Sequence, residues 1–281
     1  MIEAVVQCGR LWVHGDYVPV LRAAGLDSLD ALMAAPSEKR MDKPSLARWR
    51  QRVMLTAGGQ TLFIKRYVRP PLLEQLRQRL GGVAATAQAE WRWLGRVAAL
   101  GIAVPAPVAF GMRRRAIIEQ QSLVVTAKLA GEALEQWVPR QVNDRLRNRA
   151  FKRRLIAATA ALVARLHGAG YFHRDLYLAH IFIDDSGVDA AGGDTGGPML
   201  ALMDLQRMIQ PRLRRRRWMV KDLASLNYST PPPAMSNADR LRWLKQYLGA
   251  PRLSSKDKRL ARAVAAKTRR IARHSGKRGL G

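Results

Sequence analysis

The chain has 281 residues, and its 49 lysines and arginines against 21 aspartates and glutamates give a formal net charge of +28. Hydrophobic residues make up 48% of it, which is typical of a globular protein and excludes a disordered basic tail. The single cysteine, Cys8, excludes an intramolecular disulfide framework and a multi-cysteine zinc site. No apolar run reaches the roughly 20 residues of a membrane-spanning helix, and the N-terminal residues lack an apolar signal core. We therefore expect a cytoplasmic globular protein.

The basic residues concentrate in two stretches, 212–217 (RLRRRR) and 256–278 (KDKRLARAVAAKTRRIARHSGKR). Such charge favours nucleic acid, nucleotides, phosphorylated sugars or an anionic membrane, but it indicates a class of partner and no reaction. The sequence contains no zinc finger, no aromatic RNA-binding signature and no heptad repeat after a basic region. Nucleic acid is therefore not an expected partner.

The first half of the chain is predicted to be rich in strands. We expect residues 1–44 to form an irregular extension, because short apolar stretches there are broken by glycine, proline and acidic residues. Two β-rich runs in 52–68 flank Gly58-Gly59 and predict a hairpin. Helical periodicity predicts one prominent helix over 84–101, and strands are predicted over 104–111 and 122–129.

The second half is predicted to be mostly helical. A short helix over 134–138 and a long one over 151–170 precede a loop that leads into a short strand within 171–184. A polar turn over 185–197 separates that strand from another in 198–207. Further helices are predicted over 216–228, 237–249 and 255–274. The pattern indicates an α+β protein with two lobes, residues 1–128 and 129–281, and a ligand cleft between them.

Four polar features follow one another in a suggestive order: Lys65 in a strand, Glu90 in the next helix, His173-Arg174-Asp175 in a loop and Asp204 at a strand end. Each alone is weak, since strand lysines and helix glutamates are usually solvated. Phosphoryl transfer from ATP needs a cation on the phosphates, magnesium ions and a base near the accepting hydroxyl. These residues fit those roles, because magnesium prefers carboxylate and phosphate oxygens.

The order matches the protein-kinase signature set, with informative departures. The loop reads HRDLYLAH, so His180 takes the place of the second metal-binding asparagine, and Asp204-Leu205-Gln206 replaces D-F-G. No A-P-E follows, and no G-x-G-x-x-G precedes Lys65. The sequence therefore predicts a protein-kinase-like fold with a small-molecule acceptor.

Several stretches together resemble the lipopolysaccharide core sugar kinase family, whose members phosphorylate heptose or 3-deoxy-manno-octulosonate (Kdo). They cover roughly residues 50–250 and are FIKRYV, AEWRWL, GIAVPAPVAFG, HRDLYLAHIFI, LALMDLQR and RRWMVKDLASLNYS. The resemblance implies that Lys65 binds the ATP phosphates with Glu90 as its partner and that Asp175 is the catalytic base. It also implies that Asp204, with His180, binds Mg²⁺, and that Asp222 supports the catalytic loop.

The remaining expectations concern the nucleotide and the membrane. Backbone groups near Ala127 and Leu129 are predicted to face adenine, and the segment 48–50 (RWR) either contacts phosphates or is ordinary surface and core. The acceptor implied by the resemblance is a core glycan of lipopolysaccharide at the inner face of the cytoplasmic membrane. We therefore expect a peripheral protein in which residues 212–217 and the C-terminal helix dock on that anionic surface or on the acceptor.

Three other interpretations stay open. The chain could phosphorylate another small hydroxylated acceptor or a protein. It could also be a non-catalytic scaffold that binds nucleotide or an anionic polymer, although all four polar positions carry the residue type that catalysis needs. A protein that binds DNA is the remaining alternative, and salt-dependent affinity alone would not support it, because any chain of this charge would show it.

Overall fold

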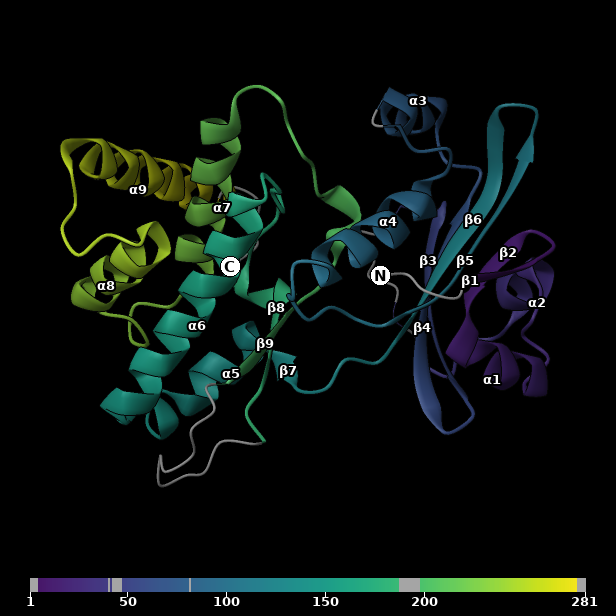
Figure 1. Ribbon diagram of the computed structural model, residues 1–281, viewed down its shortest axis with the longest axis horizontal. Coiled ribbons are helices and arrows are strands. Elements are labelled where there is room, and N and C mark those ends of the chain that lie inside the picture. The colour runs from purple at the N-terminus through teal and green to yellow at the C-terminus, as the bar shows by residue number, and fades with distance from the viewer. Residues whose placement is uncertain (1–4, 40, 42–46, 81, 187–197, 277–281) are drawn as a thin grey trace. The chain divides into compact units, whose positions relative to one another are not determined.

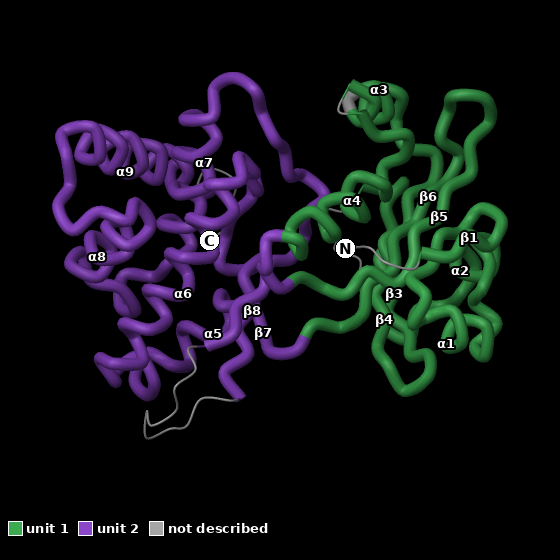
Figure 2. Tube along the Cα trace, viewed as in Figure 1, with its two compact units in different colours: residues 1–99, 104–129 green, residues 100–103, 130–281 purple. Residues whose placement is uncertain are grey.

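The computed structural model of the chain describes residues 5–39, 41, 47–80, 82–186 and 198–276. It divides into two compact units (Figure 2). Unit 1 comprises residues 1–99 and 104–129, and unit 2 comprises residues 100–103 and 130–281. Within the described ranges, no helix is both long and apolar enough to cross a membrane.

Unit 1 is built on a six-stranded antiparallel sheet (Figure 1). Its strand order is β1-β2-β5-β6-β4-β3. The strands are β1 (Val5–Cys8), β2 (Leu11–His14), β3 (Arg50–Ala57), β4 (Gln60–Val68), β5 (Pro107–Arg115) and β6 (Ile118–Ala127). The predicted hairpin is confirmed as β3–β4, with positive φ values of 56° and 74° at Gly58 and Gly59. Glycine suits this two-residue turn because only it adopts such angles without a steric penalty.

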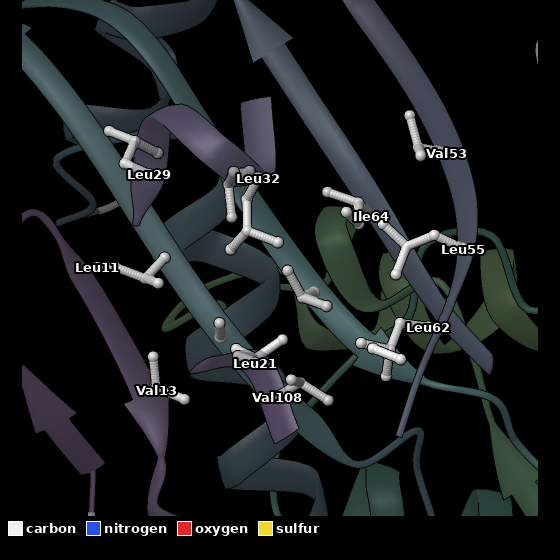
Figure 3. Close-up of a cluster of buried hydrophobic side chains, with 14 residues drawn as sticks. Leu11, Val13, Leu21, Leu29, Leu32, Val53, Leu55, Leu62, Ile64 and Val108 are labelled. Carbon is white, nitrogen blue, oxygen red and sulfur yellow. The ribbon is translucent and has the colours of Figure 1, made fainter. Parts of the chain in front are cut away.

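Two short helices cover one face of the sheet, α1 (Val18–Ala23) and α2 (Leu29–Ala34), and a single turn, η1 (Gly15–Tyr17), precedes them. Leu21, Leu29 and Leu32 from this segment pack with Leu62 and Ile64 of β4 in the main apolar cluster of unit 1 (Figure 3). The expectation of an irregular extension over residues 1–44 is therefore wrong for the described residues 5–39. Elements of four to six residues are too short to show a helical or strand period clearly in sequence.

The other face of the sheet carries α4 (Thr86–Ala98), which confirms the helix predicted over 84–101. Side chains alternate along a strand, so the neighbours of Leu62 and Ile64 on β4 point to the face of α4. Trp91 of α4 stacks on Phe110 of β5 at 6.2 Å between ring centroids. A further helix, α3 (Leu72–Leu80), was not expected from the sequence. Its leucines are largely exposed, so it lacks the buried stripe that marks a packed helix.

Unit 2 combines a small antiparallel sheet with five helices among its described residues. The sheet has the order β7-β8-β9, formed by β7 (Glu132–Ala133), β8 (Ile181–Asp184) and β9 (Met199–Leu202). The helices are α5 (Leu134–Gln141), α6 (Arg149–Gly168), α7 (Arg215–Ser229), α8 (Asn237–Leu248) and α9 (Ser255–Gly276). They confirm the helices predicted for this half. The turn predicted over 185–197 lies mostly outside the described residues.

Short turns and caps fix the ends of these elements. The single turns η2 (Arg145–Arg147), η3 (Leu178–His180) and η4 (Leu205–Arg207) lead into α6, β8 and the loop before α7. Asn148 caps α6 by accepting hydrogen bonds from two backbone N–H groups, and Ser236 with Asp239 forms a capping box on α8. Because η3 and η4 each adjoin a strand of the small sheet, they place the polar loops of unit 2 next to one another.

Candidate active site

Lys65 and Glu90 form an ion pair in unit 1. The Lys65 ammonium donates to Glu90 Oε1 at 2.8 Å. The two residues meet because the Lys65 side chain points to the face of the sheet that carries α4, opposite to the face on which Leu62 and Ile64 are buried. The Glu90 side chain is only 5% exposed, and a carboxylate so buried needs a cation to remain charged at tolerable cost. The pair fixes the position of the ammonium, which is still about a quarter exposed.

The residues expected near adenine lie at the end of unit 1. The N–H of Ala127 donates to the carbonyl of Ala106 at 3.0 Å, so this donor already has a partner within the unit. Leu129 is the last residue of unit 1 and is half-buried. In the 48–50 segment, the Arg50 guanidinium lies 4.3 Å from the centre of the Trp49 ring, and Trp49 contacts Tyr67. The roles predicted for these residues in nucleotide binding stay predictions.

In unit 2 a hydrogen bond from the loop between α6 and β8 to a side chain of α7 holds the loop in place. Asp222 is fully buried, and its Oδ2 accepts the backbone N–H of His173 at 2.7 Å. The same oxygen lies 3.4 Å from His167 Nε2, and His167 Nδ1 lies 2.8 Å from the Tyr247 hydroxyl. A charge-assisted hydrogen bond to a buried backbone N–H is among the stronger ones in proteins. Asp222 therefore holds the segment that carries His173, Arg174 and Asp175.

The side chain of Asp175 is paired with two cations. Arg207 Nη1 lies 2.7 Å from its Oδ2, and the Lys221 ammonium lies 3.3 Å from its Oδ1. Lys221 also donates to the backbone carbonyl of Arg174. Burial lowers the pKa of Lys221 below its ordinary value, although the Asp175 carboxylate acts in the opposite direction. The two cations therefore hold both carboxylate oxygens of Asp175 in place.

His180 and Asp204 direct two electron-pair donors towards the same place. His180 Nδ1 lies 2.7 Å from the backbone carbonyl of Asp175, so it carries the hydrogen of this bond, since a carbonyl only accepts. The other ring nitrogen, Nε2, lies 3.6 Å from Asp204 Oδ2, and in the neutral form of the ring it carries the lone pair. Asp204 itself has left-handed backbone angles, φ 57° and ψ 55°, at the turn after β9.

This pair fits a divalent cation that takes most of its ligands from elsewhere. No group of three or more His, Cys, Asp or Glu side chains able to hold a metal occurs among the residues that the structure describes. Mg²⁺ is commonly bound by one or two protein carboxylates together with water and substrate phosphates. Asp204 with His180 would provide such a partial site, in which the carboxylate would be the stronger ligand for Mg²⁺.

His173 is a buried residue that packs against His180 and holds the loop of Asp175 in position. It is fully buried, its Nε2 lies 2.9 Å from the carbonyl of Met203, and its ring stacks on His180 at 5.5 Å between centroids. Burial lowers the pKa of His173 below its ordinary 6.5, with a further contribution from His180. Its contact with Met203 ties the Asp175 loop to the residue just before Asp204.

The structure thus brings Asp175, His180 and Asp204 together in unit 2 and pairs Lys65 with Glu90 in unit 1. Sequence reasoning missed two side chains of this site, Arg207 and Lys221. Both lie in stretches that had been singled out, LALMDLQR and VKDLASL, and Lys221 directly precedes Asp222. A signal was therefore present, but nothing in a linear motif shows that both cations reach one carboxylate.

Comparison with known proteins agrees with these features. The model of the family described as "Lipopolysaccharide kinase (Kdo/WaaP) family" matches residues 48–247. The chain is 33% identical over 171 residues to the lipopolysaccharide core heptose(I) kinase WaaP of Pseudomonas aeruginosa, a match that spans 59% of this chain and 60% of that relative. It is 25% identical over 240 residues to the WaaP heptose(I) kinase of Escherichia coli strain K12, spanning 82% of this chain and 87% of the relative.

A solved structure is also similar. It is described as WaaP in complex with acyl carrier protein, and the match has a TM-score of 0.68 with 27% identity. The match covers 94% of this chain and 98% of the other. The expected α+β kinase-like fold is confirmed by this likeness and by the strand and helix content of the two units.

Proposed function

Because the chain belongs to the lipopolysaccharide kinase (Kdo/WaaP) family, we propose that it is an ATP-dependent kinase that phosphorylates a heptose or Kdo sugar of the lipopolysaccharide inner core. The observation that carries this proposal is the group around Asp175: a carboxylate held by two cations, beside a His180–Asp204 pair suited to Mg²⁺. Heptose is the acceptor we put first, since the similar proteins of P. aeruginosa and E. coli are heptose(I) kinases.

The residues divide the work of phosphoryl transfer. Lys65, positioned by Glu90, binds the α- and β-phosphates of ATP. Asp175 accepts a hydrogen bond from the sugar hydroxyl and orients its oxygen towards the γ-phosphorus. The new bond forms between that oxygen and phosphorus while the bond from phosphorus to the β-phosphate oxygen breaks, and ADP leaves. The hydroxyl proton passes to an oxygen of Asp175.

Lys221 and the metal ligands would compensate the negative charge of the phosphate groups during transfer. Lys221 lies beside Asp175 Oδ1, so its ammonium is close to where the transferred group meets the acceptor. Asp204 and His180 would hold Mg²⁺, which neutralises charge on the β- and γ-phosphates when bound. Most of the rate enhancement in such a site comes from positioning and from charges arranged in advance.

The test is Asp175→Ala, with Asp16→Ala as the matched control because the Asp16 side chain is 86% exposed and far along the chain from the site. Purified variants are incubated with magnesium, labelled ATP and a delipidated inner-core oligosaccharide, and phosphate incorporation is measured. We expect Asp175→Ala to lose transfer by a factor on the order of a thousand or more while ATP still raises its melting temperature. Parent-like turnover would remove Asp175 from its role, and ATP binding without any turnover in the parent would indicate a scaffold instead.

An acyl carrier protein is the partner that we propose in addition. Unit 2 contains a cavity of about 480 Å³ whose lining is mainly apolar, formed by residues such as Leu155, Leu223, Leu226, Leu244 and Val264 of α6 to α9. An acyl chain is the apolar group that such a partner carries, and an apolar cavity of this size favours an apolar occupant over water. The similar solved structure is of WaaP with acyl carrier protein.

This partner is tested by thermal unfolding with acylated and non-acylated acyl carrier protein. We expect the acylated form alone to raise the melting temperature, because burial of the chain in the cavity stabilises the folded state. Ala265→Trp, which fills part of the cavity, should abolish the difference between the two forms. An equal effect of both forms on the parent would contradict a role for the cavity.

A further inference from the structure

Helix α3 of unit 1 exposes an apolar stripe. Leu72, Leu76 and Leu80 are spaced by four residues and therefore share one side of the helix, and Leu73 lies next to the first of them. Their exposed fractions are 68%, 55% and 83%, with 62% for Leu73. Large apolar side chains that are both exposed and contiguous are uncommon on a soluble protein and usually mark an interaction site.

The opposite side of α3 is tied to the sheet, so the leucines are held outwards. Gln75 is buried, and its side-chain amide donates to the carbonyl of Pro70 at 2.8 Å. Its Oε1 accepts the backbone N–H of Glu119 at 2.8 Å, at the start of β6. These bonds fix how the helix is rotated about its axis, because a buried amide without its partners would be costly. The exposure of the leucines is thus a consequence of how the helix is anchored.

The tip of the β5–β6 hairpin adds a second apolar and cationic segment beside α3 (Figure 1). Ile117 and Ile118 are 62% and 42% exposed, and they immediately precede Glu119, the residue that Gln75 holds. Arg114 and Arg115, just before them, are exposed as well. Two elements far apart in the sequence therefore present isoleucines, leucines and arginines at the same edge of unit 1.

Most of the charges around this edge are positive. Arg69 is exposed, and its backbone N–H donates to the carbonyl of Gln120 at 2.8 Å, which places Arg69 next to the start of β6. The stretch 69–80 contains one acidic residue, Glu74, whose carboxylate accepts the Gln78 amide at 3.1 Å. Glu119 is buried and accepts hydrogen bonds from Thr86. The exposed apolar side chains are consequently flanked by arginines.

We propose that this edge, the α3–hairpin surface, inserts into the headgroup region of an anionic lipid bilayer. It consists of Leu72, Leu73, Leu76, Leu80, Ile117, Ile118, Arg69, Arg114 and Arg115. The apolar side chains enter the boundary between headgroups and acyl chains, and the arginines pair with lipid phosphates. The choice of a bilayer rests on this charge complementarity and on the proposed function, whose acceptor sugar is anchored in a membrane.

The test separates apolar insertion from general attraction of a basic protein to anionic lipid. Parent, Leu72→Gln/Leu76→Gln and the control Val6→Gln/Met199→Gln are sedimented with vesicles of phosphatidylcholine and phosphatidylglycerol at low and at high ionic strength. The control removes two apolar side chains of comparable exposure that lie elsewhere, Val6 at 45% and Met199 at 69%. Salt screens the charges but not the apolar contribution.

We expect binding at high salt to fall at least about tenfold in Leu72→Gln/Leu76→Gln and to be unchanged in the control. A fluorophore that senses polarity, attached to Leu76→Cys in a Cys8→Ser background, should shift to shorter wavelength with these vesicles. Equal binding of all three proteins at high salt would overturn the proposal. So would a parent that is dimeric in solution and becomes monomeric on Leu72→Gln/Leu76→Gln, because the surface would then join two copies of the chain.

The vesicles contain no glycan acceptor, so the result is independent of the proposed kinase activity. The same variant should phosphorylate a delipidated acceptor at the parental rate, since none of its changed residues belongs to the catalytic group. Vesicle binding that depends on the leucines, in a protein without kinase activity, would support the membrane proposal and refute the proposed function. Full kinase activity with no leucine-dependent binding would have the opposite meaning.

Discussion

At the scale of single residues, the feature that matters most is the pairing of one carboxylate with two different cations. Arg207 lies 2.7 Å from one oxygen of Asp175 and is about half exposed, whereas Lys221 is more buried and lies 3.3 Å from the other. An acceptor hydroxyl that binds Asp175 through Oδ2 would have to share that oxygen with Arg207, whereas one that binds through Oδ1 would share it with Lys221. Lys221 also donates to the carbonyl of Arg174, so its ammonium is already held in position before a substrate binds.

We expect Lys221→Met to lower kcat on the order of a hundredfold with little change in the KM for ATP, because it removes a charge that acts mainly in the transition state. Steady-state kinetics with a delipidated acceptor measure this. Lys256→Met, on the exposed start of α9, is the control and should leave both constants unchanged. A fall in melting temperature with kcat preserved would show that Lys221 is only structural.

The pH dependence of stability has a residue-scale cause in His173. Because burial lowers its pKa below 6.5, an unfolded chain binds a proton there at pH values where the folded chain does not. Protonation of His173 therefore has no effect on the free energy of unfolding above pH 6.5, and it lowers that free energy as the pH falls from 6.5 towards the folded pKa of His173. Asp222 and Asp204 oppose this shift, and His180 adds to it.

His173→Gln should reduce this acid sensitivity, since glutamine can still donate to the carbonyl of Met203 but does not titrate. Urea unfolding of parent and variant over a pH series gives the two slopes, and the parental slope is at most about 1.4 kcal/mol per pH unit steeper. Parallel curves below pH 6.5 would contradict a neutral, buried His173.

At the scale of elements, α8 is fixed to α6 through its cap. Asp239 closes the capping box with Ser236, and its carboxylate also lies 2.7 Å from the Lys152 ammonium of α6 and 2.8 Å from Arg242. Burial by itself would raise the pKa of Asp239, but the hydrogen bonds from Lys152 and Ser236 outweigh it and keep the pKa below its ordinary value. The Asp239 side chain thus caps the N-terminus of α8 and joins this helix to α6.

Asp239→Asn should lower the free energy of unfolding by about 1–2 kcal/mol at neutral pH, as measured by urea unfolding. The contribution is present above pH 3.8, the ordinary pKa, and is lost as the pH falls through the lower folded value. Asp257→Asn is the matched control, because Asp257 forms the same capping box with Ser254 at the start of α9 but, among the described residues, has no ion pair to a second helix. Equal losses in the two variants would show that the link to α6 adds nothing.

At the scale of the whole molecule, the net charge of +28 dominates encounters with other molecules. Helix α9 packs on α7, and the Thr268 hydroxyl of α9 accepts the Asn227 amide of α7 at 3.0 Å. Its other side exposes lysines and arginines, among them Lys258, Arg262 and Arg269. We propose that this side and residues 212–217 give the long-range attraction to an anionic membrane, and that the α3–hairpin surface gives the salt-resistant part.

Lys258→Glu/Arg262→Glu/Arg269→Glu should weaken sedimentation with anionic vesicles at low salt, since each basic residue near such a surface contributes about 1 kcal/mol. The same variant should match the parent at high salt, where Leu72→Gln/Leu76→Gln differs most. Unchanged binding at low salt would remove α9 from membrane docking. Kinase activity on a delipidated acceptor checks that the variant folds.

Much of the fold could be predicted because its signals are local. Helices α4 and α6 show in sequence as apolar periodicity, and Gly58-Gly59 marks the β3–β4 turn. Elements without such signals were missed: β1, β2, α1 and α2 are too short for a clear period, and α3 turns its leucines outwards. A pattern read on the assumption that apolar residues are buried does not detect a helix that exposes them.

The order of the polar residues, and the stretches that resemble the lipopolysaccharide core sugar kinase family, can be recognised in the amino-acid sequence alone. Tertiary structure alone decided that Lys221 and Arg207 meet at Asp175, that His180 turns its Nε2 towards Asp204, and that Gln75 directs the leucines of α3 away from the sheet. The physical reason is that these contacts join segments far apart along the chain. Their geometry depends on packing and burial, which no local stretch of sequence encodes.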